Sequence, residues 1–332
     1  VDLSRTIEVI NGQIDIQQAN KLYFSTRSAV LSILTTFDIL LAIVWNGETV
    51  AGYVYRELNL LGLVRTLYLE ISNMPGLLFC NSRGVNARSS LFFNPNALDS
   101  LPDPGEEAFV EWKANYLKRN SKYLPPQARL IKKVNMYSAI DSWFATIFFR
   151  PKVDCRSLFS RVSLMAHRIC VNIPYADEIP SSRYVFLPLQ VTTDTQLQIN
   201  SDYDNFDAVF RALAIAKRSM FKLVVKIHPA EVDQGFINKL TQMSNDLEFL
   251  ISSSDTFKLI SFSSEVVVNN STVGLEAMIL EKRVHVIGRA FYSNFNHIQL
   301  RKYILSYLVP IDYFNTADID SAAVKKMLCY AE

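Results

Sequence analysis

Residues 265–288 read EVVVNNSTVGLEAMILEKRVHVIG, and this stretch decides the fold class. The apolar run Glu265–Asn270 predicts a buried strand, residues 272–281 predict a helix, and Val284–Gly288 predict a second buried strand. A strand, a helix and a strand in succession are typical of a parallel βαβ unit. The stretch therefore predicts an α/β protein with a parallel sheet.

The same alternation extends in both directions and predicts two Rossmann-like lobes with parallel sheets and a cleft between them. The first lobe is expected over 1–165, the second over 166–296, and C-terminal helices over 297–332 that pack back across both lobes. The remaining elements are expected as strands at 39–45, 65–71, 183–190, 221–228 and 247–251, and as helices at 48–61, 106–118, 205–219, 233–245 and 256–262.

Composition excludes several classes of protein. The 34 basic and 32 acidic residues are spread along the chain and give a net charge of +2, so no basic face for nucleic acid is expected. The most apolar stretch, Asp38–Trp45, is far shorter than the ~20 residues of a membrane helix. Charged residues interrupt positions 1–20, which argues against a signal peptide and predicts a cytoplasmic protein.

Ligands of doubly wound sheets bind at the carboxyl ends of the strands, so residues that follow strands are the first candidates. Asp194 lies in the loop after the strand at 183–190, where an aspartate can act as a nucleophile, as a general base or as a turn former. Lys226 and His228 end the next strand, and this pair suits a phosphate leaving group because both can stabilise growing negative charge.

The segment Asn269–Ala277 (NNSTVGLEA) combines a strand end with a helix start. Ser271 and Thr272 stand at the expected N-terminus of the helix, where backbone N–H groups favour an anion. Glu276 lies one turn further and is able to accept hydrogen bonds from ribose hydroxyls. An ordinary N-cap followed by a first-turn acid is the alternative interpretation.

Glu70 ends a strand in the first half of the chain, ahead of the segment GVNARSS (84–90). Its carboxylate is suited either to take a proton from an acceptor hydroxyl or to pair with a neighbouring arginine. The sequence Asp202-Tyr-Asp204 resembles a metal-binding DxD motif, but a solvated loop is the better interpretation. The four histidines lack the spacing of metal ligands, and neither a P-loop nor GxGxxG is present, so no metal or cofactor is expected.

Read together, PLQVTTDTQ (188–196), KIHP (226–229) and NNSTVGLEA (269–277) resemble the bacterial capsule polysaccharide biosynthesis family. A looser similarity covers WNG (45–47), Glu70 and 84–90. Within the family, the chain resembles the retaining β-Kdo glycosyltransferases of capsule and O-antigen assembly. This resemblance implies a GT-B-like fold and CMP-β-Kdo as the donor substrate.

The resemblance also implies roles for individual residues. Asp194 matches the aspartate that attacks the anomeric carbon and forms a covalent adduct, and Glu70 is the corresponding candidate for the acceptor base. The phosphate and nucleotide contacts fall on Lys226, His228, Ser271, Thr272 and Glu276. Kdo carries a carboxylate on its anomeric carbon, and the candidates for contacting or neutralising it are Arg183, Gln196, Lys226 and Arg289.

Two alternatives remain open at this point. One is a GT-B transferase with another donor, such as CMP-sialic acid or a UDP-sugar, in which Asp194 serves as the base of an inverting reaction. The other is a non-catalytic module that binds a glycan or a nucleotide. In the favoured interpretation the partners are a CMP-sugar and a lipid-linked glycan acceptor, and no nucleic acid is expected. No transmembrane segment is expected either, and peripheral association with the cytoplasmic face of the inner membrane is compatible with this interpretation.

Overall fold

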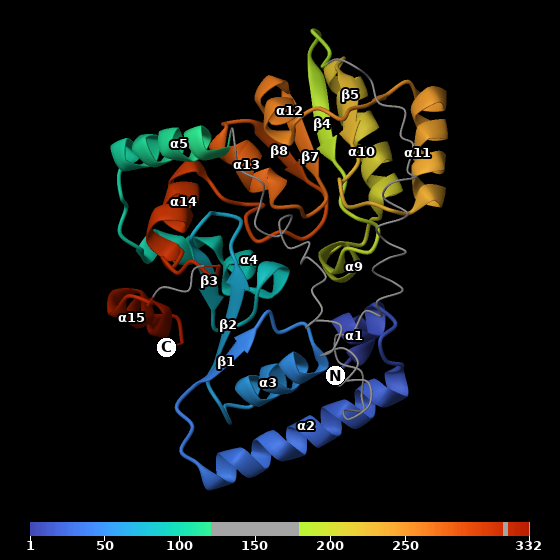
Figure 1. Cartoon of the computed structure of the whole chain (residues 1–332). Helices are drawn as coiled ribbons and strands as arrows, with labels where there is room; N and C mark the ends of the chain where they lie inside the picture. Colours follow the sequence, from blue (N-terminus) through green and yellow to red (C-terminus); the bar gives the residue numbers. More distant parts are fainter. Residues whose placement is uncertain (121–178, 315–317, 332) are drawn as a thin grey trace, which may run out of the picture. The chain divides into compact units, whose positions relative to one another are not determined.

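The computed structural model describes residues 1–120, 179–314 and 318–331 (Figure 1). The chain divides into two compact units, one comprising Val1–Lys122 with Arg289–Glu332 and the other Tyr123–Gly288. The lobe boundary predicted at residue 165 lies outside the described residues. The residues from Arg289 onward, which include the helices expected over 297–332, group with the first unit.

The first unit carries a three-stranded sheet in the order β1-β2-β3. β1 (Ala42–Trp45) and β2 (Thr66–Ile71) are parallel and are connected through α3 (Val50–Leu60), as predicted. β3 (Leu78–Asn81) is antiparallel to β2, because the few residues at 72–77 are too short for a crossover. Among the described strands of this unit, the predicted parallel arrangement therefore applies only to β1 and β2.

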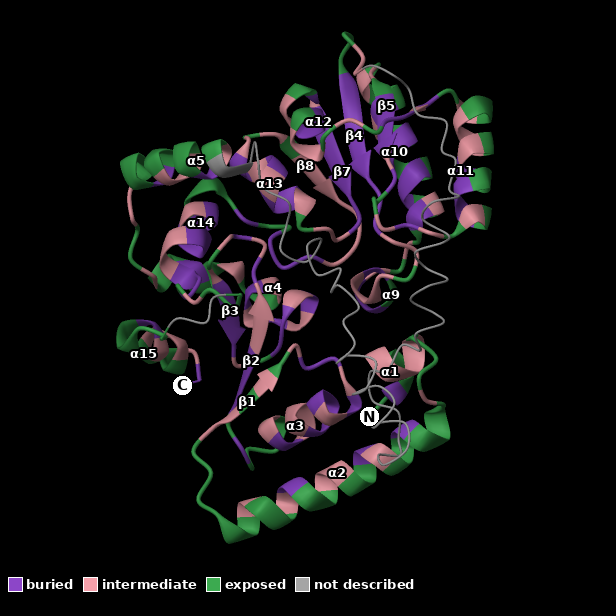
Figure 2. Ribbon diagram, in the orientation of Figure 1, coloured by how far each residue is buried: buried purple, intermediate pink, exposed green. Residues whose placement is uncertain are grey.

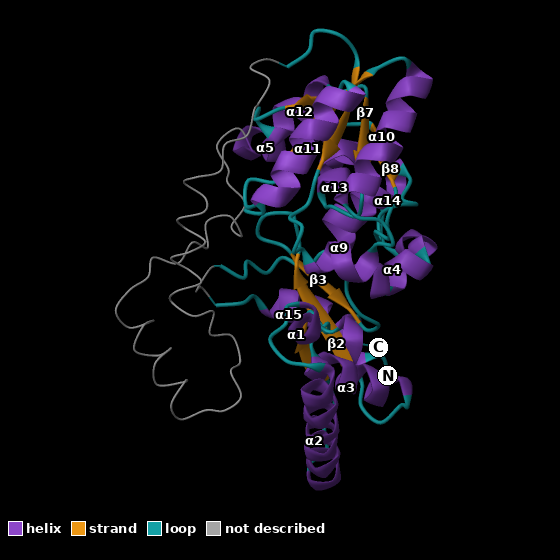
Figure 3. Ribbon diagram, turned by 90° about the vertical axis from the view of Figure 1, so that its right-hand side faces the viewer, coloured by secondary structure: helices purple, strands orange, loops and turns teal. Residues whose placement is uncertain are grey.

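The longest helix among the described residues, α2 (Ile16–Thr36), is absent from the sequence-based prediction. Its N-terminus is a capping box, in which Asp15 Oδ1 accepts from the Gln18 amide at 2.8 Å and Gln18 Oε1 accepts from the Asp15 amide at 2.9 Å. Ala19, Tyr23 and Val30 bury its inner face in a cluster that also contains residues of α3. Figure 3 shows α2 as one continuous helix.

The C-terminal segment packs against β3 within the same unit. The backbones of Leu78 and Val309 exchange hydrogen bonds of 2.8 and 3.0 Å, and the Tyr307 hydroxyl donates to the Cys80 carbonyl at 2.5 Å.

The other helical segments of this unit are a 3-10 turn (Leu3–Arg5), α1 (Ile7–Ile10), a 3-10 turn (Asn86–Arg88), α4 (Ser90–Phe93), a 3-10 turn (Pro95–Ser100), α5 (Glu106–Asn120), α14 (His297–Lys302), a π-helical turn (Tyr303–Tyr307) and α15 (Ser321–Cys329).

The second unit is a doubly wound α/β layer structure. Its described strands form one fully parallel sheet in the order β6-β5-β4-β7-β8, which confirms the alternation predicted from residue 183 onward. In chain order its elements are β4 (Tyr184–Pro188), α9 (Thr195–Asn200), α10 (Asn205–Ser219), β5 (Lys222–Lys226), α11 (Gln234–Leu247), β6 (Leu250–Ile251), α12 (Thr256–Phe262), β7 (Glu265–Val268), α13 (Val273–Ile279) and β8 (Arg283–Val286).

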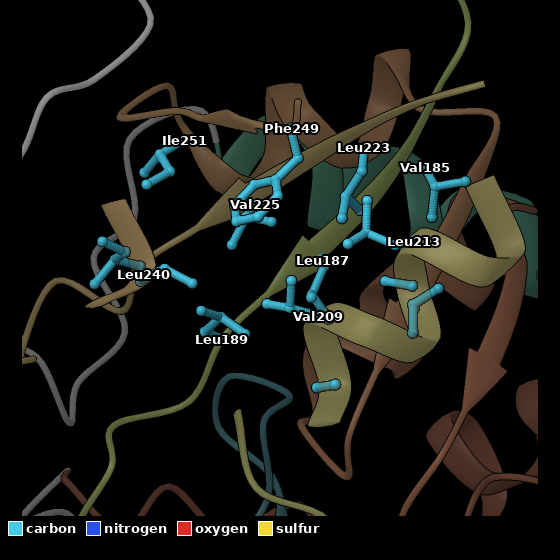
Figure 4. Packing of buried hydrophobic residues seen from close by; sticks show 14 of the residues in the cluster. Val185, Leu187, Leu189, Val209, Leu213, Leu223, Val225, Leu240, Phe249 and Ile251 are labelled. Atoms are coloured by element: carbon cyan, nitrogen blue, oxygen red, sulfur yellow. The ribbon is translucent and has the colours of Figure 1, made fainter. Parts of the chain in front are cut away.

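The two faces of this sheet have separate cores. α10 and α11 cover the face formed by Val185, Leu187 and Val225, shown from close by in Figure 4. α12 and α13 cover the opposite face, where Phe186 and Val266 are fully buried. β4 and β7 are buried along their whole length (Figure 2) because both faces are covered. Each fully buried aliphatic side chain contributes about 1.5–3 kcal/mol, which fixes the strands and thereby the loops that follow them.

None of the helices formed by residues that the structure describes has both the length and the apolar character required to cross a membrane.

Candidate functional site

The strand order of the second unit places a topological switch point between β4 and β7. From β4 the chain proceeds to β5 on one side and later returns to β7 on the other. The loops that follow β4 and β7 therefore start side by side at the carboxyl ends of these two strands and lead away in opposite directions. Ligands of open α/β sheets usually bind at such a position. These two loops contain Asp194 and Asn269–Asn270, so two of the segments predicted from the sequence meet at this point.

Asp194 is the N-cap residue of α9. Its Oδ1 accepts from the Gln196 amide at 2.8 Å, and its Oδ2 accepts from the Gln190 side-chain amide at 3.1 Å. The carboxylate is half-buried and is held by donors on both oxygens. Asp194 thus has the turn-forming role that the sequence left open. The same hydrogen bonds orient its carboxylate at the switch point.

Gln190 connects the two loops. Its Oε1 accepts from the Asn270 amide at 3.4 Å while its Nε2 donates to Asp194. The Asn270 side chain donates to the Gln196 carbonyl at 2.8 Å, and the Asn269 side chain donates to the Tyr203 carbonyl at 2.7 Å. The Oδ1 atoms of Asn269 and Asn270 are buried without a hydrogen-bond partner among the described residues. Such acceptors are suited to a ligand that brings hydroxyl or amino donors.

Lys226 and His228 end β5 in different environments. The Lys226 ammonium group donates to the Ser254 carbonyl at 2.6 Å, and burial lowers its pKa while the charge of Asp255 opposes this effect. His228 is exposed, and its Nδ1 accepts from the Ala230 amide at 3.1 Å. With Nδ1 as an acceptor, the proton of the neutral imidazole lies on Nε2, which is the arrangement of a hydrogen-bond donor.

The segment after β7 leads into α13, which begins at Val273, one residue later than predicted. Ser271 Oγ accepts from the Val273 amide at 3.3 Å, whereas Thr272 makes no side-chain capping bond. The pKa of the Glu276 carboxyl is raised to about 7, mainly by burial and in addition by the negative charge of Asp255. Lys226 and Glu276 thus share Asp255 as a charged neighbour.

Glu231 is a site residue that the sequence analysis missed. It is 5% exposed, and its carboxylate accepts from the Thr192 amide at 2.7 Å and from the Val232 and Asp233 amides at 2.8 and 2.9 Å. It therefore ties the loop that carries Asp194 to the loop that follows His228. In the sequence, Glu231 is an acid in a turn that contains a proline. This pattern cannot be distinguished from that of a solvated loop residue.

Glu70 lies in the first unit, at the penultimate position of β2. The pKa of its carboxyl is raised to about 7: burial raises it most, a hydrogen bond from the Asn46 side chain lowers it, and the negative charge of Glu48 raises it. In the part of the chain that the structure describes, the Asn46 side-chain amide donates to Glu70 Oε2. A carboxyl with a pKa near 7 is suited to general acid–base chemistry at neutral pH.

The structure does not bring all predicted residues to the switch point. Arg183 directly precedes β4 and therefore lies at the opposite end of this strand from Asp194. Arg289 belongs to the first unit. Gln196 is at the switch point, where its side-chain oxygen accepts from Asn200 at 2.7 Å. Within the described ranges, no group of three or more His, Cys, Asp or Glu side chains is arranged to hold a metal ion.

A comparison with known families covers the second unit. Residues 172–295, which include every described strand of the second unit, match the model of the family described as capsule polysaccharide biosynthesis protein. The resemblance inferred from the sequence is thereby confirmed for this segment, which contains Asp194, His228 and Glu276.

Individual relatives are more distant. Protein FixF of Sinorhizobium fredii (strain NBRC 101917 / NGR234) is 32% identical over 115 residues, which are 33% of this chain and 27% of that protein. The match thus spans about a quarter of the curated relative. Among solved structures, the β-Kdo 2,7 transferase of Thermosulfurimonas dismutans KpsC aligns with a TM-score of 0.45 and 16% identity over 92% of this chain and 89% of that chain. The β-Kdo 2,4 transferase of the same protein aligns with a TM-score of 0.42 and 13% identity over 86% of each chain.

Proposed function

We propose that this protein is a retaining glycosyltransferase of bacterial surface polysaccharide synthesis that transfers Kdo from CMP-β-Kdo to a glycan acceptor. The observation that carries the proposal is the position of Asp194. Its carboxylate is held by Gln190 and the Gln196 amide at the switch point, within the segment that matches the capsule polysaccharide biosynthesis family. A GT-B-type arrangement of the two units is part of this proposal.

In the first step, an Asp194 oxygen attacks the anomeric carbon of Kdo. The bond between that carbon and the phosphate oxygen breaks, and CMP departs with the electron pair. His228 suits the leaving phosphate because its Nε2 carries a hydrogen-bond donor, and Lys226 supplies positive charge. Ser271, Thr272 and Glu276 are assigned to the nucleotide, with Glu276 accepting from ribose hydroxyls.

In the second step, Glu70 takes the proton of an acceptor hydroxyl, whose oxygen attacks the anomeric carbon. The bond to Asp194 breaks, and its carboxylate is restored. Two inversions at the same carbon retain the configuration. We assign the sugar carboxylate to the neighbourhood of Lys226 and Gln196. The reaction as proposed uses no metal or cofactor, and it acts on a lipid-linked acceptor at the cytoplasmic face of the inner membrane.

The proposal is tested by measuring CMP release from CMP-Kdo, generated in situ, by wild type, Asp194→Asn and Asp204→Asn. Asp204 is the matched control, since it also caps a helix of the second unit and accepts from a backbone amide at 2.8 Å. We expect Asp194→Asn to lose at least 100-fold in kcat, in the range found when a group that acts directly in chemistry is removed. Asp204→Asn should retain activity.

Equal activity of all three proteins would refute the role of Asp194. Release of CMP from CMP-sialic acid, or turnover of a UDP-sugar, without reaction of CMP-Kdo would refute the donor assignment. Binding of CMP without turnover of any of these donors would identify a non-catalytic module.

A further inference from the structure

Glu70 is held by a turn whose conformation is unusual. The chain leaves β1 through Asn46 and Gly47, which have φ angles of +59° and +81° in the left-handed region. Asparagine is one of the few residues other than glycine that adopts this conformation without large strain. The Asn46 amide N–H donates to the Leu69 carbonyl at 2.8 Å, so the turn is fixed to the strand position next to Glu70.

The Asn46 side chain is oriented by bonds at both of its ends. Its Oδ1 accepts from the Glu48 amide at 3.2 Å, and its Nδ2 donates to Glu70 Oε2. Since Oδ1 already faces a donor, the amide group cannot rotate by 180° without losing both contacts. The side chain therefore presents a donor to Glu70 in one orientation.

An ionic cluster around the buried Glu48 fixes the other side of the turn. Glu48 is 1% exposed, and it pairs with Arg56 at 3.3 Å and with Arg88 at 3.0 Å. Arg56 also donates to the Gly47 carbonyl at 3.0 Å, and Arg88 donates to the Tyr53 hydroxyl at 2.6 Å. Because the buried charge of Glu48 is compensated by these two arginines, this cluster resists deformation of the turn.

We infer that Asn46 is a positioning residue, which holds the Glu70 carboxylate in a single orientation through an amide that the Glu48 turn has already oriented. The inference rests on the proposed role of Glu70 as the acceptor base. Glu48, Arg56 and Arg88 act through Asn46 by fixing the turn, so none of them needs to touch a substrate.

The direct test is the titration of Glu70 by NMR, in protein labelled with 13C at the glutamate carboxyl carbon and assigned with Glu70→Gln. Asn46→Gly preserves the left-handed turn and removes the donor, whereas Asn46→Asp replaces the donor by a negative charge. The pKa of Glu70 should rise by about one pH unit in Asn46→Gly and by more in Asn46→Asp. Asn59→Ala is the control, because Asn59 donates to the Ser82 carbonyl at 3.1 Å in the same unit. It should leave the titration unchanged.

Kinetics separate positioning from electrostatics. At pH 9 Glu70 is largely ionised in wild type and in Asn46→Gly, so an electrostatic effect alone would largely disappear in this pair of proteins. We expect kcat of Asn46→Gly to remain about tenfold lower at pH 9 with little change in the KM for the acceptor, because the freed carboxylate samples unproductive rotamers. Asn59→Ala should match wild type.

The outcomes distinguish this inference from the proposed function. An unchanged Glu70 titration in both Asn46 variants overturns the inference, whether or not the enzyme transfers Kdo. Full recovery of kcat at pH 9 overturns positioning as well. A shifted titration in a protein that turns over no donor supports the contact between Asn46 and Glu70 but refutes the proposed function.

Discussion

Replacing Glu231 by glutamine tests whether the two loops at the switch point are fixed by one buried carboxylate. Glu231 Oε2 accepts from the Thr192 amide at 2.7 Å, while Oε1 accepts from the Val232 and Asp233 amides at 2.8 and 2.9 Å. Glutamine keeps one acceptor oxygen and replaces the other by an NH2 group. In the better of its two orientations, this NH2 group faces the Thr192 amide, donor against donor.

The expected loss follows from these contacts. One hydrogen bond to a charged acceptor disappears, and the half-buried Thr192 amide is left without a partner, which together cost about 2–3 kcal/mol. For a unit of this size, the loss corresponds to a melting temperature lower by about 4–12 °C. Differential scanning calorimetry measures the shift, and hydrogen exchange of the Thr192 amide should accelerate in the variant.

Glu248→Gln is the matched control, because Glu248 is exposed and its replacement should change stability by less than about 0.5 kcal/mol. Equal melting temperatures and equal Thr192 exchange in Glu231→Gln and wild type would refute this account of the loop contact.

Two further predictions concern other positions. Burial raises the pKa of Glu276 to about 7 from an ordinary 4.5, so the folded protein holds a proton that the unfolded chain releases, and stability falls as the pH rises from about 4.5 to about 7. Glu276→Gln removes this dependence, and calorimetry at pH 5 and pH 8 should show the variant gaining on the order of 3 kcal/mol relative to wild type between the two pH values. Parallel pH profiles would contradict the raised pKa of Glu276. Gly52→Ala places a methyl group 2.5 Å from the Gly47 backbone and should lower stability by about 1–3 kcal/mol in thermal unfolding, since the turn before α3 must shift. A melting temperature equal to that of wild type would show that this packing is looser than described.

The sequence predicted the second unit well because each strand there is a short apolar run followed by polar residues. The helix at 256–262 has the predicted bounds, and β7 begins at Glu265 as predicted. These patterns are local, since burial on both faces of a parallel sheet requires continuous apolar strands. The first unit was predicted less completely. The capping box at Asp15 and Gln18 was the local signal for α2, and the short strand β3 depends on pairing with β2 and Val309, which no local pattern encodes.

The candidate site shows the same limit. Asp194, Lys226 and Glu276 could be selected because they follow strands or begin a helix, and the structure places them at the carboxyl edge of the sheet. Arg183 precedes β4 by one residue, so it lies at the opposite end of this strand from Asp194, and its charge alone did not reveal this. The roles of Gln190, Glu231 and Asn46 are contacts between loops distant in sequence, so they become visible only when the fold brings these loops together.

The central claim is that Asp194 forms a bond to the sugar, and intact-protein mass spectrometry tests it most directly. Wild type and Asp194→Ala are incubated with CMP-Kdo, generated in situ because the donor is labile, and their masses are compared. The account predicts that wild type gains the mass of one Kdo residue and that the variant gains none. Normal product formation by wild type without any adduct, or an adduct of equal yield on Asp194→Ala, would contradict it.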